Sequence, residues 1–151
     1  MELIAILKDG TPERAVSGLS PAAPEVLAAM AQLYAAVGFT RPWIGYLALE
    51  DGACVGTCGF KSAPRDGRVE IAYFSFPGNE GRGVATRIAA ALLEIARSTD
   101  ARVAVAAQTL PQESASTSVL KKLGFEHAST LEHPEDGTVW EWRLGDGHPR
   151  R

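Results

Sequence analysis

A glycine-rich turn in the middle of the sequence is the clearest candidate for chemistry. It reads Glu80-Gly81-Arg82-Gly83-Val84-Ala85 and lies between a predicted strand that ends at Phe76 and a predicted helix. Backbone N–H groups at the start of a helix form a positive terminus, and glycine lets an anion approach them closely. Arg82 adds a cation at the rim. The turn therefore predicts a binding site for an anion such as a pyrophosphate.

Two other phosphate-binding motifs do not fit this turn. A P-loop requires Gly-Lys-Ser or Gly-Lys-Thr, and neither follows here. A dinucleotide-binding motif would have a third glycine where Thr86 stands and an early strand-helix-strand unit, whereas three strands are predicted before this turn. The glycines could also do no more than join a strand to a helix, so other features of the sequence must decide.

The pattern along the chain predicts a single sheet flanked by helices. Asp51-Gly52 joins two runs of strand-forming residues and is the strongest short signal for a hairpin. Apolar residues recur at intervals of three and four before Gly38 and after the glycine-rich turn, as on one face of an amphipathic helix. This order predicts an α+β (α/β) fold. The predicted strands cover 3–7, 43–50, 53–61, 68–76, 103–107, a run from 125 onward and 138–144, and the predicted helices cover 24–37, a stretch from the glycine-rich turn and 113–123.

Length, charge and cysteine content limit the class of protein. The 151 residues, 46% of them hydrophobic, suit one domain, which we expect over 1–145, with a disordered tail over 146–151. A net charge of −3 argues against a nucleic-acid partner.

Charged residues interrupt the long apolar stretches, and the start lacks a secretory signal, which predicts a cytoplasmic protein without membrane contact. Cys54 and Cys58 are expected to be reduced core residues, and no metal site is predicted.

The glycine-rich turn resembles the signature of the GCN5-related N-acetyltransferase (GNAT) superfamily. That signature is Gln or Arg, two residues, Gly, one residue, and then Gly or Ala. Its last two fixed positions match here as Gly83 and Ala85, whereas Glu80 stands where Gln or Arg is usual. The resemblance strengthens the interpretation of the turn as an anion site.

Other stretches are similar to the branch of this superfamily that acetylates the N-termini of ribosomal proteins. One is the predicted strand Val69-Glu70-Ile71-Ala72-Tyr73-Phe74, and the others are 109–116 and 119–125, where the branch has a second cofactor-contacting helix. Glu113 stands where the branch commonly has Asn. The resemblance spans roughly Tyr46 to Leu144, which is most of the chain.

The resemblance implies a fold, a cofactor and a reaction. The fold is a single GNAT-like domain with a mixed, mostly antiparallel sheet of about six to seven strands and about three to four flanking helices. The cofactor is acetyl-CoA, and the reaction is direct attack of a primary amine on its thioester. By the same resemblance, the cofactor contacts are Phe74, Ser75, Phe76, Glu80, Gly81, Arg82, Gly83, Val84, Ala85, Thr86, Glu113 and Ser116.

Two side chains are candidates for catalysis. Glu70 is the candidate base, with a solvent-facing or salt-bridged carboxylate as the alternative. Ser116 is a candidate to contact the cofactor or assist the sulfur, with an ordinary first-turn helix residue as the alternative. The resemblance also implies that the backbone of 74–76 binds pantetheine and donates an N–H to the developing oxyanion. Many superfamily members protonate the departing thiolate with a tyrosine, and that position falls at Leu120.

The acceptor is expected to be a small-molecule or peptide amine, and aromatic residues around the end of the first helix are candidates to bind it. These residues are Tyr34, Phe39 and Trp43, which an apolar core would also explain. The net negative charge of the chain favours a cationic acceptor. The chain is expected to be a monomer or a homodimer. Two alternatives to an enzyme are a module that binds acyl-CoA without turnover and an interaction protein whose glycine-rich turn binds nothing.

Overall fold

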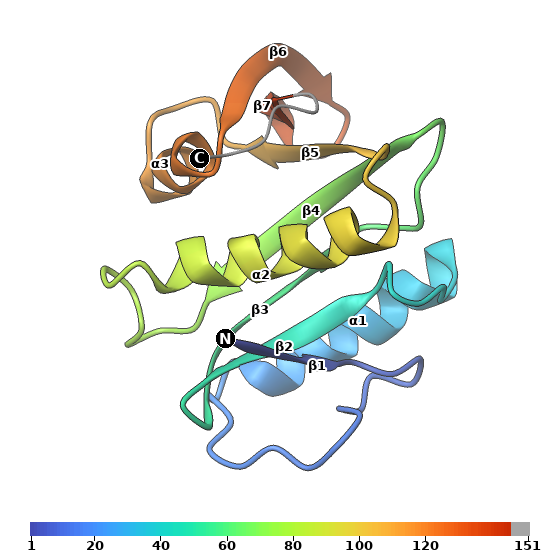
Figure 1. The fold of residues 1–151 in the computed structure, drawn as a ribbon, viewed down its shortest axis with the longest axis vertical. Helices are drawn as coiled ribbons and strands as arrows, with labels where there is room; N and C mark the ends of the chain where they lie inside the picture. Colours follow the sequence, from blue (N-terminus) through green and yellow to red (C-terminus); the bar gives the residue numbers. More distant parts are fainter. Residues whose placement is uncertain (146–151) are drawn as a thin grey trace.

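The computed structural model describes residues 1–145, which form one mixed sheet with helices on its faces (Figure 1). The sheet has seven strands in the order β1-β2-β3-β4-β5-β7-β6, so β1 lies at an edge, as predicted. The α+β fold expected from the sequence is confirmed. The strands are β1 (Glu2–Ala5), β2 (Gly45–Glu50), β3 (Ala53–Phe60), β4 (Arg68–Ser75), β5 (Ala104–Thr109), β6 (Phe125–His133) and β7 (Gly137–Leu144), and the helices are α1 (Ala23–Val37), α2 (Val84–Thr99) and α3 (Ala115–Lys122).

Neighbouring strands are antiparallel except for β4 and β5, which are parallel. A parallel pair requires a long crossover, and α2 provides it by crossing one face of the sheet (Figure 1). Ile88 of α2 occupies the space beside Gly56 on that face, whereas Met30 of α1 occupies the space beside Gly45 on the other. The two helices therefore cover opposite faces and meet different sides of β3 and β4.

The predicted hairpin between β2 and β3 is confirmed, whereas several other predicted boundaries shift. Asp51 and Gly52 have φ values of 53° and 82°, the pair of positive values that a two-residue type I′ turn needs. The helix predicted from residue 113 begins at 115 because Ser114 caps it. β5 continues to Thr109, beyond the predicted end at Ala107, because it pairs with β7 there.

Several expectations about composition can be compared with the described residues. Cys54 and Cys58 are both buried and free. No group of His, Cys, Asp and Glu within residues 1–145 is arranged to hold a metal ion. No helix in this part of the chain is long and apolar enough to cross a membrane. The tail predicted to be disordered, 146–151, lies outside the described residues.

Candidate active site

The central sheet opens between β4 and β5. The parallel ladder of these strands ends at the pair Ile71 and Ala107, although β4 continues to Ser75. Beyond that pair, β5 is held by β7, whose ladder extends to Thr109. In the described part of the chain, the last residues of β4 therefore present a backbone edge with no strand beside it.

Successive backbone N–H groups of β4 point to opposite sides of the strand, so only every second one faces this open edge. Phe76, just after the strand, donates its N–H to the carbonyl oxygen of Val55 in β3 at 2.9 Å. In an antiparallel ladder every second residue directs its N–H to the same neighbouring strand, so Phe74 also donates toward β3. The N–H groups of Tyr73 and Ser75 therefore face the open edge.

This geometry separates the three residues expected to contact the cofactor through their backbone. The N–H groups of Phe74 and Phe76 are engaged with β3, and the Phe76 side chain is fully buried. Of the three, only Ser75 directs its N–H to the open edge. Tyr73 does so as well, although the sequence did not mark it as a site residue. These two N–H groups are about 6.6 Å apart along the strand, so each is available to a different acceptor.

The glycine-rich turn adopts a backbone that leaves the start of α2 without a cap. Gly81 and Gly83 have φ values of 81° and 73°, a region that glycine enters more readily than other residues. Gly83 is the N-cap residue, no side-chain hydrogen bond caps the helix, and its first turn contains no acidic residue. The first-turn N–H groups, from Val84 to Thr86, are therefore donors at the positive end of the helix for an anion to accept.

Charged side chains around the turn form hydrogen bonds and ion pairs with one another and with the loop. Glu80 Oε1 accepts a hydrogen bond from the Gly78 N–H at 2.8 Å, so this carboxylate is tied to the loop. Arg87, one turn into α2, forms a bidentate ion pair with Glu50 at 2.6 and 2.9 Å. Its guanidinium lowers the pKa of Glu50. Arg87 also donates to the carbonyl oxygen of Arg82, whose own guanidinium remains at the exposed rim.

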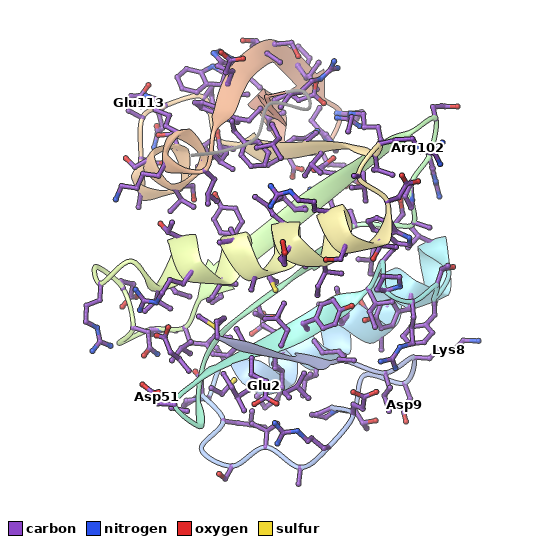
Figure 2. All side chains as sticks on the ribbon, viewed as in Figure 1. Glu2, Lys8, Asp9, Asp51, Arg102 and Glu113 are labelled. Carbon is purple, nitrogen blue, oxygen red and sulfur yellow. The ribbon has the colours of Figure 1, made fainter. Side chains whose placement is uncertain are left out.

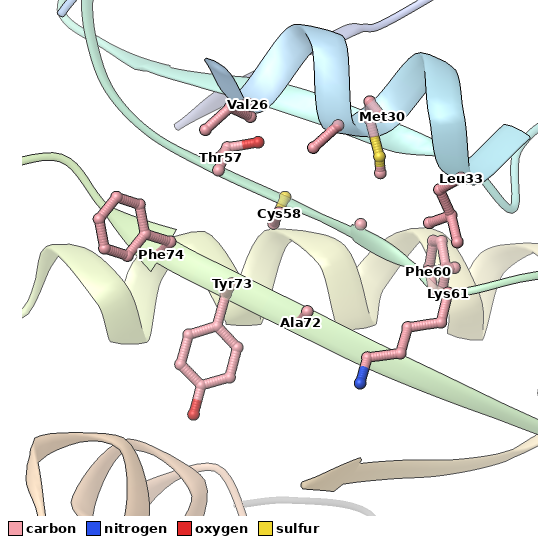
Figure 3. Close-up of a pocket in the computed structure, with 12 residues that line it drawn as sticks. Val26, Met30, Leu33, Thr57, Cys58, Phe60, Lys61, Ala72, Tyr73 and Phe74 are labelled. Atoms are coloured by element: carbon pink, nitrogen blue, oxygen red, sulfur yellow. The ribbon is translucent and has the colours of Figure 1, made fainter. Parts of the chain in front are cut away.

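A hydrogen bond crosses the opening from β4 to α3. The Tyr73 hydroxyl donates to the backbone carbonyl oxygen of Ser116 at 3.1 Å, and Figure 3 shows the Tyr73 ring pointing away from α1. Burial raises the pKa of Tyr73 to about 12, so the phenol is protonated at neutral pH. Leu120, at the position of the superfamily's usual tyrosine, is fully buried. No local motif marks Tyr73, because its partner lies 43 residues along the chain.

The start of α3, unlike that of α2, is capped by its own side chains. Ser114 Oγ accepts from the Thr117 N–H at 3.3 Å, and Thr117 Oγ1 accepts from the Ser114 N–H at 2.9 Å. Glu113 is exposed (Figure 2), and its Oε1 accepts from Lys121 Nζ at 2.8 Å, which lowers the pKa of Glu113. Ser116 is exposed and contributes its backbone carbonyl to the bond with β4. The capping box therefore satisfies the Thr117 N–H in the first turn of α3, whereas the first turn of α2 has no side-chain cap.

Glu70, the candidate base, is paired with a lysine. Lys61 Nζ lies 2.5 Å from Glu70 Oε2, and the Glu70 side chain is 15% exposed. Because a strand rises about 3.3 Å per residue, Glu70 lies about 13 Å along β4 from Phe74. The carboxylate is therefore distant from the open edge at Ser75, and its charge is balanced. This position agrees with the salt-bridged alternative.

A mostly apolar pocket of about 360 Å³ lies between α1 and the face of β3 and β4 that α2 does not cover (Figure 3). Val26, Met30 and Leu33 line it from α1. Phe74 lies toward one end, beside the open edge of β4, and Lys61 lies toward the other. The pocket therefore runs along the sheet from the Lys61–Glu70 ion pair to the point where β4 and β5 part.

The three aromatic residues predicted to bind the acceptor are found beside this pocket rather than in its lining. Tyr34 is buried, and its hydroxyl donates to the Ile6 carbonyl oxygen at 2.8 Å. Phe39 packs edge-on against Tyr34, with ring centroids 4.9 Å apart, and Trp43 packs in the same way against Phe60 at 5.0 Å. These contacts agree with the apolar-core alternative, and a role in acceptor binding stays a prediction.

The sequence from residue 3 to residue 126 matches the family model of the acetyltransferase (GNAT) domain. This match covers most of the chain, and it includes β4, the glycine-rich turn and α3. The chain therefore belongs to the GNAT acetyltransferase family, as its resemblance implied. A comparison with curated protein sequences gives no significant match.

Solved structures that share this fold include several acetyltransferases. An acetyltransferase from Agrobacterium tumefaciens is 22% identical with a TM-score of 0.60, over 84% of this chain and 72% of that one. A ribosomal-protein-alanine N-acetyltransferase from Brucella melitensis is 21% identical with a TM-score of 0.56, over 66% and 67%. The aminoglycoside acetyltransferase AAC(6')-Ib, in complex with coenzyme A, is 22% identical with a TM-score of 0.58, over 67% of this chain and 65% of its own length. At these identities the likeness establishes the fold.

Proposed function

We propose that this protein transfers an acetyl group from acetyl-CoA to a primary amine. The observation that carries the proposal is the connection between two kinds of donor. The open edge of β4 ends at Ser75, and the uncapped start of α2 follows at Val84 after one short loop. A molecule with a thioester at one end and a pyrophosphate at the other can use both sets of donors at once.

The residues present fit acetyl-CoA. The N–H groups of Val84, Ala85 and Thr86 would hold the pyrophosphate, and Arg82 would add a positive charge at the rim. The free edge of β4 would hold the pantetheine amides through Ser75. The carboxylate of Glu80 does not oppose this arrangement, because it accepts a hydrogen bond from Gly78.

When bound, acetyl-CoA supplies a thioester that a neutral amine attacks directly. The Tyr73 N–H would donate to the thioester carbonyl oxygen as negative charge develops on it, whereas the Ser75 N–H would bind a pantetheine amide. The Tyr73 hydroxyl would give its proton to the sulfur as the C–S bond breaks and the N–C bond forms, while water takes the proton that the nitrogen loses. Ser116 would act as a positioning residue, since its carbonyl oxygen holds that hydroxyl.

The initial rate of coenzyme A thiol release, measured with acetyl-CoA and a panel of primary amines, tests this proposal. An enzyme gives amine-dependent release together with an acetylated amine in the mass spectrum. A module that binds acyl-CoA without turnover would bind acetyl-CoA yet release no thiol with any amine. A cytoplasmic location and the choice between monomer and homodimer remain predictions.

A further inference from the structure

We propose that the pocket between α1 and the β3–β4 face binds the apolar body of the acceptor, and that the acceptor is a small alkylamine or arylalkylamine. This inference rests on the proposed function and names the substrate class of the same site. The overall charge of the chain favours a cationic acceptor, whereas the pocket favours one whose single cationic group is the reacting amine.

The lining favours an apolar ligand. Side chains of Val26, Met30 and Leu33 form the α1 wall, and Phe74 contributes aromatic surface from the sheet. The volume of about 360 Å³ lies in the range of pockets that bind small molecules. Phe74 is 49% exposed, which is unusual for a large apolar side chain on a central strand. An apolar ligand body would cover it.

The position of the pocket directs the amine to the expected thioester. Phe74 lies toward the end of the pocket at which β4 and β5 part, and the next residue, Ser75, directs its N–H to the open edge. A ligand whose apolar body fills the pocket would therefore hold its amine beside this edge.

The charges around the pocket disfavour a polycation. Within residues 1–145 no acidic residue lines it, and its lining includes the cationic Lys61. The Glu70 carboxylate, on the same strand as the lining residues Ala72 and Phe74, is already paired with Lys61 at 2.5 Å. A second or third ammonium group would thus lose its hydration without finding a partner. A single amine fares differently, because apolar surroundings lower its pKa and favour the neutral form that attacks the thioester.

Competing amines and a pair of matched variants test the inference. The amines are 2-phenylethylamine, hexylamine, spermidine, kanamycin and a polar peptide that begins with alanine, each assayed by thiol release from acetyl-CoA. Ala29→Phe fills the pocket from an exposed helix position, and Ala28→Phe makes the same change at an exposed neighbour that does not line it. Ala72→Leu fills the pocket from the sheet side in case the helix variant fails to fold.

We expect kcat/KM for the two apolar amines to exceed that for the other acceptors at least tenfold. Ala29→Phe or Ala72→Leu should lower this value at least tenfold without changing acetyl-CoA affinity, and Ala28→Phe should match the wild type. Faster turnover of spermidine, kanamycin or the peptide would overturn the inference and leave the proposed function standing. Equal rates for Ala29→Phe and the wild type with 2-phenylethylamine would also overturn it. If no amine is acetylated, the proposed function fails, and the inference fails with it.

Discussion

The Tyr73 hydroxyl and the Ser116 carbonyl oxygen lie 3.1 Å apart and join β4 to α3 where the central sheet opens. The phenol therefore stands at the same edge that carries the N–H groups of Tyr73 and Ser75. A buried Leu120 occupies the position at which the superfamily usually has a tyrosine. A single residue of β4 thus combines a backbone donor and a proton donor at the candidate reaction centre.

Removing the Tyr73 hydroxyl should slow the reaction without weakening cofactor binding. In Tyr73→Phe we expect kcat to fall about tenfold or more. This is less than the roughly hundredfold or larger effect usual for a general acid, because a thiolate is a good leaving group. Acetyl-CoA affinity should stay within about twofold of the wild type. Tyr46→Phe is the control, since it removes a hydroxyl that donates to the Pro42 carbonyl oxygen away from the opening. Equal kcat values for both variants and the wild type would exclude Tyr73 as the proton donor.

The raised pKa of Tyr73 fixes the sign of an alkaline effect on stability. Tyrosine ordinarily titrates near pH 10, and burial raises the pKa of Tyr73 to about 12. The folded state thus favours the neutral phenol, whose contribution is complete below about pH 10 and is lost as the pH rises toward 12. Between pH 9 and 11 (about one unit each side of the ordinary value), the free energy of unfolding should therefore decrease less in Tyr73→Phe than in the wild type. Parallel losses in urea unfolding curves would show that Tyr73 does not titrate in this way.

Gly83 should matter for binding beyond its effect on stability. Gly83 and Gly67 have the same φ of 73°, and neither lies against rigid neighbouring atoms. Gly83→Ala and Gly67→Ala should each lower the free energy of unfolding by about 1 to 2 kcal/mol, because both force alanine into the left-handed region. Only Gly83→Ala should weaken acetyl-CoA binding, by at least tenfold in calorimetric titrations. Equal affinities in the two variants would mean that the turn is purely structural.

Neutralising Glu70 should have little effect on turnover. Its carboxylate pairs with Lys61 and lies about 13 Å along β4 from Phe74. We expect Glu70→Gln to change kcat by less than about threefold and to leave the pH profile unchanged, with a stability loss of about 0 to 1 kcal/mol, as for a partly exposed pair. A loss of about a hundredfold together with a shifted acidic limb in the pH profile would restore Glu70 as the base.

The candidate cofactor site could be predicted from the sequence because its signal is local. Gly81 and Gly83 stand next to the helix that they start, so the turn and the uncapped N–H groups follow from one short stretch. The role of Tyr73 could not be predicted, because it depends on a contact with Ser116 that only the fold creates. The same is true of Phe74, whose N–H is engaged because β4 pairs with β3 in one register.

The apolar periodicity of α1 could not predict which of its residues line the pocket. The spacing of apolar residues in α1 predicts the helix, yet it does not separate the residues that enter the core from those that line a pocket. Tyr34 enters the core and donates to Ile6, whereas Leu33, one position earlier, lines the pocket. Successive helix residues differ by about 100° around the axis, and the docking of α1 on the sheet decides which of them faces the cavity.

A thermal-shift titration with acetyl-CoA, coenzyme A and ATP tests the central claim most directly, because a ligand that binds the native state raises its apparent stability. At about a hundredfold excess over Kd, the melting temperature should rise by roughly 5 to 10 °C with both coenzyme forms. ATP, which has phosphates but no pantetheine to pair with the open edge of β4, should cause no comparable shift. The absence of a shift with acetyl-CoA and coenzyme A would contradict the assignment of the glycine-rich turn and β4 as an acetyl-CoA site.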